Sequence, residues 1–213
     1  MDLKEILQSK KGISIELLLF FLIAVFMTSI LGSGLLLYPL ALTSLGVRKV
    51  EWSDIGLKRT DFTVKNILTG VAIAVVYYFT DQYLINPIAS KFAPPGLPEI
   101  FNIKGDLPKY LIGLLLSWII AAFLEEIVFR GYLINRFIDL IGVSVWKKII
   151  IVLVTGIGFG LVHSYQGING AISAGFIGVF QAITYFLCGK KLTIPIIAHG
   201  VFDTIEFTLL FLG

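Results

Sequence analysis

Residues 110–137 read YLIGLLLSWIIAAFLEEIVFRGYLINRF, and this stretch decides the fold. Its first half, up to residue 124, carries no charged side chain. An α-helix of about 20 apolar residues, rising ~1.5 Å per residue, spans the ~30 Å hydrocarbon core of a bilayer. The stretch is long enough for this. It therefore predicts a transmembrane helix whose second half carries charged side chains.

The overall composition extends this interpretation to the whole chain. Hydrophobic residues make up 57% of the 213 residues and charged residues 15%, whereas soluble domains carry roughly 25% charged residues. This excludes a water-soluble domain and a disordered chain. The net charge of +3 without a long basic run argues against nucleic-acid binding. Cys188 is the single cysteine, so a disulfide framework is excluded.

Five further stretches approach the length of a membrane span. We therefore expect an all-α, polytopic bundle of about six transmembrane helices that forms one domain over residues 1–213, embedded as a multi-pass protein in the cell membrane. The first stretch is predicted to be one tilted or kinked helix with bends at Gly32, Gly34 and Pro39. The five stretches cover residues 13–40, 64–84, 148–163, 171–188 and 192–212.

The segments between the spans set the expected orientation. Residues 50–62 are polar with scattered apolar positions and are predicted to lie in the membrane interface. Residues 86–107 contain four prolines and form the longest predicted loop. With six crossings, one side holds 9 Lys and Arg in its loops and the other 6, which favours both termini outside the cytoplasm. Two crossings in the first stretch would move the N-terminus alone to the other side.

Ionisable side chains interrupt three of the predicted spans. Such a group at the centre of a bilayer costs at least ~2.5–3.5 kcal/mol. His163 and His199 are the two histidines of the chain, and both fall inside or at the edge of an apolar stretch. Counted from one membrane side, Glu125, both histidines and Asp203 lie at depths of ~12–22 Å. We therefore expect three helices to bring these groups into one active site within the bilayer.

Other polar or small residues in the spans have structural interpretations. Glu126 and Arg130 are four residues apart and are predicted to form an ion pair that holds helices together. Glu206 is assigned no role. The glycines of residues 155–160, TGIGFG, lack the Lys-Ser/Thr of a phosphate loop, so they indicate close helix packing.

A carboxylate and two imidazoles in an apolar environment suit the activation of water. Glu125 would act as the general base, and His163 would share the water and pass its proton to the leaving amine. His199 and Asp203 could face the oxyanion of a tetrahedral intermediate. The chain has no Gly-x-Ser-x-Gly or Ser-x-x-Lys pattern, which makes a serine nucleophile less attractive.

A metal site stays open at this point. Glu, His and His form a permissible set of zinc ligands, and Asp203 could be a fourth. The His-Glu-x-x-His signature of many zinc peptidases is absent, but the residues alone do not exclude zinc.

Three short motifs resemble those of a known family. Residues 125–130 (EEIVFR) match Glu-Glu-x-x-x-Arg, residues 159–163 (FGLVH) match Phe-x-x-x-His, and residues 199–203 (HGVFD) match His-x-x-x-Asn/Asp. In this order they resemble the CAAX protease and bacteriocin-processing (CPBP, or Abi) family of intramembrane endopeptidases. The resemblance covers residues 110–207, which form the expected catalytic core.

The resemblance implies a glutamate-dependent peptidase rather than a zinc enzyme, so zinc is not favoured and no cofactor is expected. Glu125 and His163 would activate the attacking water, and His199 and Asp203 would form the oxyanion hole. Glu126, Arg130 and Phe159 would support them, Arg130 by holding a substrate carboxylate or by orienting Glu126. The implied partner is a prenylated CAAX protein or another membrane-associated peptide. The best-described members carry Asn at the position of Asp203, and an Asp can donate a hydrogen bond only when it is protonated.

Two alternatives belong to other functional classes. A non-catalytic bacteriocin self-immunity or peptide-binding protein could use the same fold. A proton-coupled carrier could also use intramembrane Glu, His and Asp residues. A carrier would need repeat symmetry between its halves, and the first half of the chain has no counterpart to the charged cluster.

Overall fold

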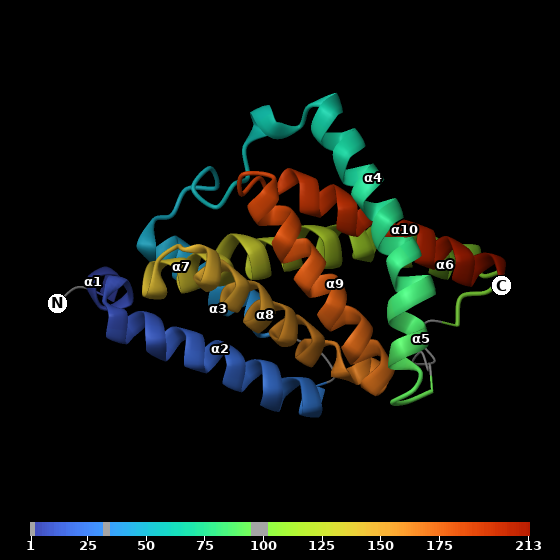
Figure 1. Ribbon diagram of the computed structural model, residues 1–213, viewed down its shortest axis with the longest axis horizontal. Helices are drawn as coiled ribbons and strands as arrows, with labels where there is room; N and C mark the ends of the chain where they lie inside the picture. The colour runs from blue at the N-terminus through green and yellow to red at the C-terminus, as the bar shows by residue number, and fades with distance from the viewer. Residues whose placement is uncertain (1–2, 32–34, 95–101) are drawn as a thin grey trace.

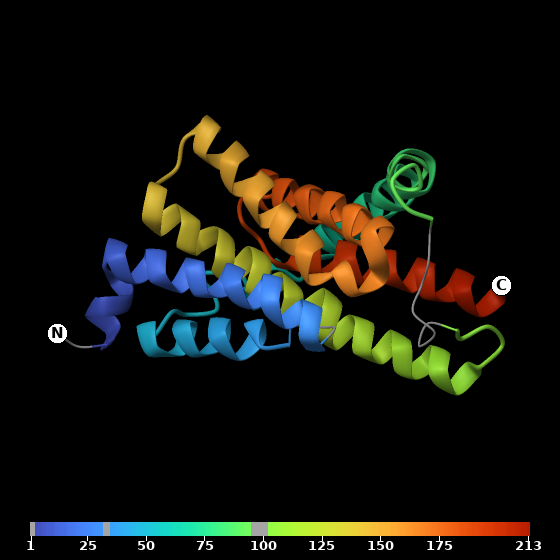
Figure 2. The ribbon, with the colours of Figure 1, turned by 90° about the horizontal axis from the view of Figure 1, so that it is seen from below.

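The structure, a computed structural model, describes residues 3–31, 35–94 and 102–213 and is helical throughout, with no strand in these ranges. Figures 1 and 2 show the helices packed as one elongated bundle. Within the described ranges, five helices are long and apolar enough to cross a membrane, which confirms an all-α membrane bundle. They are Val64–Ala89, Leu107–Ile141, Val145–Val162, Ser164–Leu187 and Thr193–Leu212.

Several of these long helices are composed of shorter segments with different hydrogen-bonding patterns. Wide π-helical turns occupy Asp81–Ile85, Ser117–Glu125 and Ile127–Ile134, and 3₁₀ turns occupy Arg59–Asp61 and Ser164–Gln166. The α-helices are α1 (Leu3–Gln8), α2 (Lys10–Leu31), α3 (Leu37–Arg48), α4 (Val64–Thr80), α5 (Asn86–Ala89), α6 (Leu107–Leu116), α7 (Asn135–Ile141), α8 (Val145–Val162), α9 (Gly167–Leu187) and α10 (Thr193–Leu212).

The first apolar stretch forms two helices, so the prediction of one kinked helix is wrong. α2 ends at Leu31, and α3 starts at Leu37 and runs back beside α2 (Figure 2). Pro39 lies in the first turn of α3, where a backbone N–H has no intrahelical partner, so the proline starts this helix instead of bending a longer one. The predicted bends at Gly32 and Gly34 lie outside the described residues.

This reversal places the two termini at opposite ends of the bundle (Figure 1). Near one end of the helix Leu107–Ile141, the Gly105 N–H donates to the Phe211 carbonyl oxygen at 2.9 Å. Near its other end, the Arg136 guanidinium donates to the Leu7 carbonyl oxygen at 2.7 Å. The expectation that both termini lie on the same side is therefore wrong, because the first stretch contains one more reversal than predicted.

The segment after α3 closes over the ends of other helices. Ile55 is buried and would be the nearest neighbour of a side chain at Gly131. The Gly56 carbonyl accepts a hydrogen bond from the Leu192 N–H at 2.8 Å, and the Ile55 carbonyl accepts one from the Tyr185 hydroxyl at 2.9 Å. Residues 50–62 thus form turns that pack on the ends of other helices.

Glycines bring α8 and α9 into close contact, as the sequence indicates. A Cβ atom at Gly160 would lie 2.6 Å from the Ala171 carbonyl oxygen, and one at Gly156 would lie 3.2 Å from the Gly175 carbonyl oxygen. Larger residues would separate the two backbones, so TGIGFG is confirmed as a helix-packing segment.

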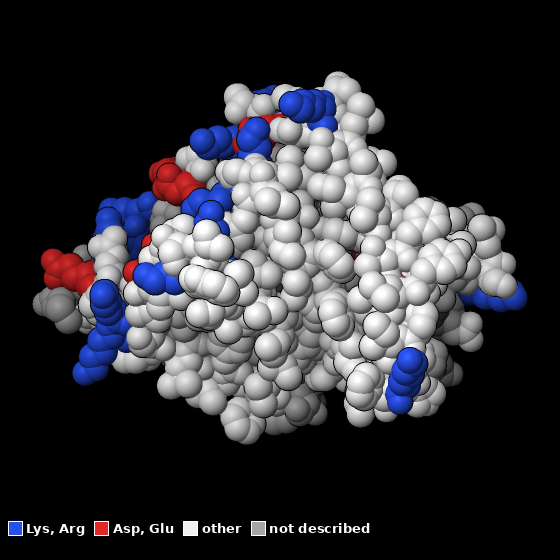
Figure 3. Space-filling model, viewed as in Figure 1, with Lys and Arg blue, Asp and Glu red and all other residues white. Residues whose placement is uncertain are grey.

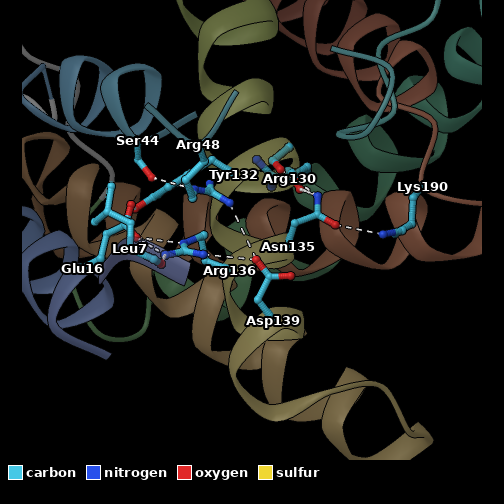
Figure 4. Close-up of polar contacts among 11 residues, drawn as sticks. Leu7, Glu16, Ser44, Arg48, Arg130, Tyr132, Asn135, Arg136, Asp139 and Lys190 are labelled. Atoms are coloured by element: carbon cyan, nitrogen blue, oxygen red, sulfur yellow. Dashed lines mark hydrogen bonds and ion pairs between the residues drawn. The ribbon is translucent and has the colours of Figure 1, made fainter. Parts of the chain in front are cut away.

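A network of charged groups, buried at Glu16 and Arg136 and exposed at Asp139, joins the N-terminal helices to α7 (Figure 4). Arg136 forms an ion pair with Glu16 of α2 and a second one with Asp139 at 3.2 Å. The Tyr132 hydroxyl donates to the other oxygen of Glu16 at 2.8 Å. Arg48, at the end of α3, approaches Asp139 at 3.8 Å. In this cluster, both carboxylate oxygens of Glu16 have donors.

Candidate active site

Two adjacent glutamates lie between the two π-helical segments of the long helix Leu107–Ile141. Glu125 ends the first segment, and Glu126 precedes the second. π-helical turns are rare in proteins and are frequently found at functional sites. The two side chains engage different partners: Glu125 contacts Tyr38 and His163, and Glu126 contacts Arg130 and His199.

Glu125 faces His163 across a short gap. Glu125 Oε2 lies 3.9 Å from His163 Nε2 and has no hydrogen-bond partner although it is buried. Its other oxygen, Oε1, accepts a long hydrogen bond of 3.3 Å from the Tyr38 hydroxyl of α3. His163 Nδ1 lies 2.8 Å from the Phe159 carbonyl oxygen. Because a carbonyl can only accept, Nδ1 carries a proton, and Nε2 is the nitrogen directed at Glu125.

Glu126 orients the second histidine. Glu126 Oε1 accepts from His199 Nδ1 at 2.9 Å and from Arg130 Nη1 at 3.0 Å. The Arg130 guanidinium also donates to the Gly178 carbonyl oxygen of α9 at 3.0 Å. Arg130 is 1% exposed, so its charge is engaged inside the protein. The predicted Glu126–Arg130 ion pair is therefore present, and it extends to His199.

Asp203 lies one turn beyond His199 on α10. His199 Nε2 is 3.8 Å from Asp203 Oδ1. The other carboxylate oxygen, Oδ2, accepts a hydrogen bond of 2.6 Å from the Ser117 hydroxyl at the start of the first π-helical segment. Ser117 thus connects α10 to the helix that carries Glu125.

The Phe159 ring lies among these groups. Its centroid is 4.5 Å from that of His163 and 6.0 Å from that of His199, and the Arg130 guanidinium carbon lies 4.8 Å from it. Phe159 is 2% exposed. The structure therefore brings all seven residues selected from the sequence into one contiguous cluster on three helices, around a buried aromatic ring.

Two cavities meet at His163. One, of about 150 Å³, is lined by Glu125, Tyr38 and Tyr165 together with apolar side chains of α3 and of the long helix. The other, of about 220 Å³, is lined by His199, Asp203 and several further polar side chains. His163 lines both. A small molecule such as water can therefore approach this imidazole from either side.

Sequence reasoning gave no role to several polar residues in and beside these cavities, among them Tyr38, Asp81, Ser117 and Glu206. Ser117 is a polar residue within an apolar run, which is a usable signal. Tyr38 gives no such signal, because its position depends on the unforeseen reversal between α2 and α3. Asp81 accepts from the Ser173 hydroxyl and from Asn86 at 2.9 Å, and Glu206, which the sequence reading left without a role, accepts from Gln82 at 3.1 Å. Asp81 and Glu206 both line the larger cavity.

The histidines and carboxylates do not converge on one point. Glu125 pairs with His163, whereas Glu126 and Asp203 flank His199. In the part of the chain that the structure describes, no group of three or more His, Cys, Asp and Glu side chains has the arrangement of a metal site.

Comparison with known proteins gives one match. The model of the family described as type II CAAX prenyl endopeptidase Rce1-like matches residues 107–205. This segment contains all three motifs, and the match confirms the family resemblance found in the sequence. No curated protein and no solved structure matches the chain.

Proposed function

We propose, from the membership of residues 107–205 in the Rce1-like family, that this membrane protein is an intramembrane endopeptidase of the cell membrane. It hydrolyses a peptide bond of a membrane-associated substrate with water activated by Glu125 and His163. The single observation that carries this proposal is the gap between Glu125 Oε2 and His163 Nε2. The two atoms are 3.9 Å apart, which is too far for a direct hydrogen bond, and a water oxygen can lie within ~2.8 Å of both.

The attack step follows from this geometry. Glu125 removes a proton from the water while the water oxygen bonds to the carbonyl carbon of the peptide. His163 Nε2 accepts the second hydrogen of the same water as a hydrogen bond, since its Nδ1 proton is held by the Phe159 carbonyl. The proton taken up by Glu125 then passes to the leaving amine as the C–N bond breaks, which restores the Glu125 carboxylate.

His199 is proposed to stabilise the oxyanion. With both ring nitrogens protonated, it donates Nδ1–H to Glu126 and can donate Nε2–H to the negatively charged oxygen. Arg130 holds Glu126 in place and thereby orients His199. Asp203, which accepts a hydrogen bond from Ser117, positions the Nε2 side of the ring. In this scheme Arg130 and Glu126 act by positioning.

The test is hydrolysis by purified protein in nanodiscs, read by mass spectrometry with a peptide library that includes prenylated C-terminal peptides. Glu125→Ala and a zinc chelator are run alongside. Cleavage that resists the chelator and disappears in Glu125→Ala supports the proposal. Cleavage lost with the chelator would assign the reaction to a metal enzyme. Equal cleavage by Glu125→Ala would overturn the role of this glutamate.

A further inference from the structure

The positive charges of the protein gather at one end of the bundle. Figure 3 shows most of the visible Lys and Arg over the end that carries α1 and α7 and along the edge that continues to the start of α4, with a few on the opposite side. All Lys and Arg residues lie in described segments. Those at this end are Lys4, Lys10, Lys11, Arg48, Lys49, Lys58, Arg59, Lys65, Arg136, Lys147, Lys148, Lys190 and Lys191. The other end has Lys91, Lys104 and Lys109.

Contacts between distant segments define this basic end. Arg136 bonds the Leu7 carbonyl oxygen, Lys190 bonds Asn135 at 2.9 Å, and Lys191 approaches Asp61 at 3.6 Å. Membrane proteins carry the excess of Lys and Arg on their cytoplasmic side. The basic end, and with it the N-terminus, is therefore assigned to the cytoplasm, and the C-terminus to the opposite face.

The larger cavity lies in the half of the bundle away from the basic end. α8 starts beside Lys147 and ends at His163, and α9 returns from the cavity toward Lys190. The cavity is lined by the last part of the helix Val64–Ala89, by the end of α8, by the first half of α9 and by α10 from His199 onward. Gln166, in the turn between α8 and α9, and Asn169, in the first turn of α9, give its outer part polar walls.

The smaller cavity lies in the same half. Leu37, at the beginning of α3, lines it, whereas Arg48, at the end of α3, belongs to the basic end. Tyr165, which is 40% exposed in the turn after α8, lines it as well. Both cavities that His163 lines thus lie nearer to the face opposite the cytoplasm.

The charge of the larger cavity restricts what can bind there. Asp81, Asp203 and Glu206 line it, and none of its lining residues is Lys or Arg. Arg130 is buried and donates to Glu126 and to the Gly178 carbonyl, so it is not available to a ligand. A peptide carboxylate in this cavity would meet three carboxyl side chains, and the cationic group among the lining residues, His199, is already paired with Glu126.

We infer that the substrate is a peptide that reaches the site from the face opposite the cytoplasm and is cleaved at a bond away from its free carboxyl terminus. This rests on the proposed peptidase function and names its substrate class: a neutral or cationic peptide segment outside the cytoplasm. A cytoplasmic CAAX tail, cleaved three residues from a free carboxylate, fits neither the side nor the charge of the cavity.

Single-cysteine variants test the side of the membrane without requiring activity. In a Cys188→Ser background, Asn102→Cys and Ser53→Cys report the two ends of the bundle, and Ser173→Cys reports the larger cavity. Intact cells are treated with a membrane-impermeant thiol reagent. We expect Asn102→Cys and Ser173→Cys to be labelled in intact cells and Ser53→Cys to be labelled after permeabilisation. If Ser173→Cys, like Ser53→Cys, were labelled only after permeabilisation, the inference would be overturned.

The same variants test the charge of the cavity. Ser173→Cys is treated with a methanethiosulfonate that carries a trimethylammonium group or with one that carries a sulfonate group. After normalisation to Asn102→Cys, we expect the cationic reagent to react at least about tenfold faster, because a cleft lined by one sign of charge concentrates the opposite sign. Equal rates would overturn the assignment of a cation-favouring cavity.

A pair of peptides connects the inference to hydrolysis. One peptide ends in a free carboxylate three residues after the tested bond, and the other has the same sequence with a C-terminal amide. We expect the amide to be cleaved at least about tenfold faster, and faster cleavage of the free acid would contradict the inference. If neither were cleaved, the proposed peptidase function would fail, whereas the labelling pattern would still decide the side and charge of the cavity.

Discussion

Two clusters of buried charged side chains differ in how completely they are hydrogen-bonded. At the basic end, Glu16 accepts from Tyr132 through one oxygen and from Arg136 through the other. In the candidate active site, Glu125 Oε2 and Glu126 Oε2 are buried without a hydrogen-bond partner. Native proteins satisfy most buried polar atoms, so an unsatisfied one needs a reason. The comparison teaches that burial of charge alone does not indicate function, whereas an incomplete set of partners next to a cavity does.

The largest effect on activity is expected at Glu125, whose set of hydrogen-bond partners is incomplete. Glu125→Gln keeps the shape of the side chain but removes its capacity to take a proton. We expect kcat/KM for peptide hydrolysis to fall by about 10²–10⁴-fold, the usual contribution of a general base, with little change in thermal unfolding. Glu51→Gln, at an exposed glutamate in the loop after α3, is the matched control. A loss of activity that follows the loss of folded protein would contradict the assigned role.

At the basic end we expect the opposite pattern, a loss of stability without a loss of activity per folded molecule. Glu16→Ala leaves Arg136 buried without its main anion and should reduce the free energy of unfolding by roughly 3–5 kcal/mol. The measurement is thermal unfolding in detergent, followed by activity per folded molecule, which should be unchanged. If Glu16→Ala lowered the activity of the folded fraction as much as Glu125→Gln, the distinction between the two clusters would be lost.

A smaller effect is expected from Ser117→Ala. The Ser117 hydroxyl donates to Asp203 at 2.6 Å, and a hydrogen bond to a charged group contributes about 1.5–3 kcal/mol. We therefore expect kcat/KM to fall by about 10- to 100-fold, because Asp203 and His199 lose a fixed position. Ser14→Ala, at an exposed serine of α2, is the control. Unchanged kcat/KM in Ser117→Ala would remove Ser117 from the site.

The smallest effect is expected from Tyr38→Phe. The hydrogen bond from Tyr38 to Glu125 is long, at 3.3 Å, so we expect it to contribute less than the short Ser117–Asp203 bond, about 0.5–1.5 kcal/mol. We expect kcat/KM to change by about two- to tenfold, with Tyr83→Phe at a 77% exposed tyrosine as the comparison. A loss as large as that of Glu125→Gln would show that the hydroxyl takes part in the proton transfer itself.

Local sequence patterns were sufficient for much of the fold. The four spans from residue 107 onward begin and end within seven residues of their predicted limits, because each is predominantly apolar and short segments with polar or glycine residues separate them. The prediction for the first stretch failed because the sequence is apolar from α2 through to α3, so hydropathy cannot separate one helix from two. The predicted orientation of the termini depended on the number of helices in this stretch, so it changed when that number changed.

The sequence by itself determined which residues form the candidate site. Ionisable groups are so costly within apolar helices that Glu125, His163, His199 and Asp203 stand out without structural information. Only the tertiary structure decided their pairing: Glu125 with His163, and Glu126 with His199. It also added Tyr38 and Ser117, and it located the cavity away from the basic end. The physical reason is that insertion energy depends on one residue at a time, whereas partners, cavities and sidedness depend on how separate helices pack together.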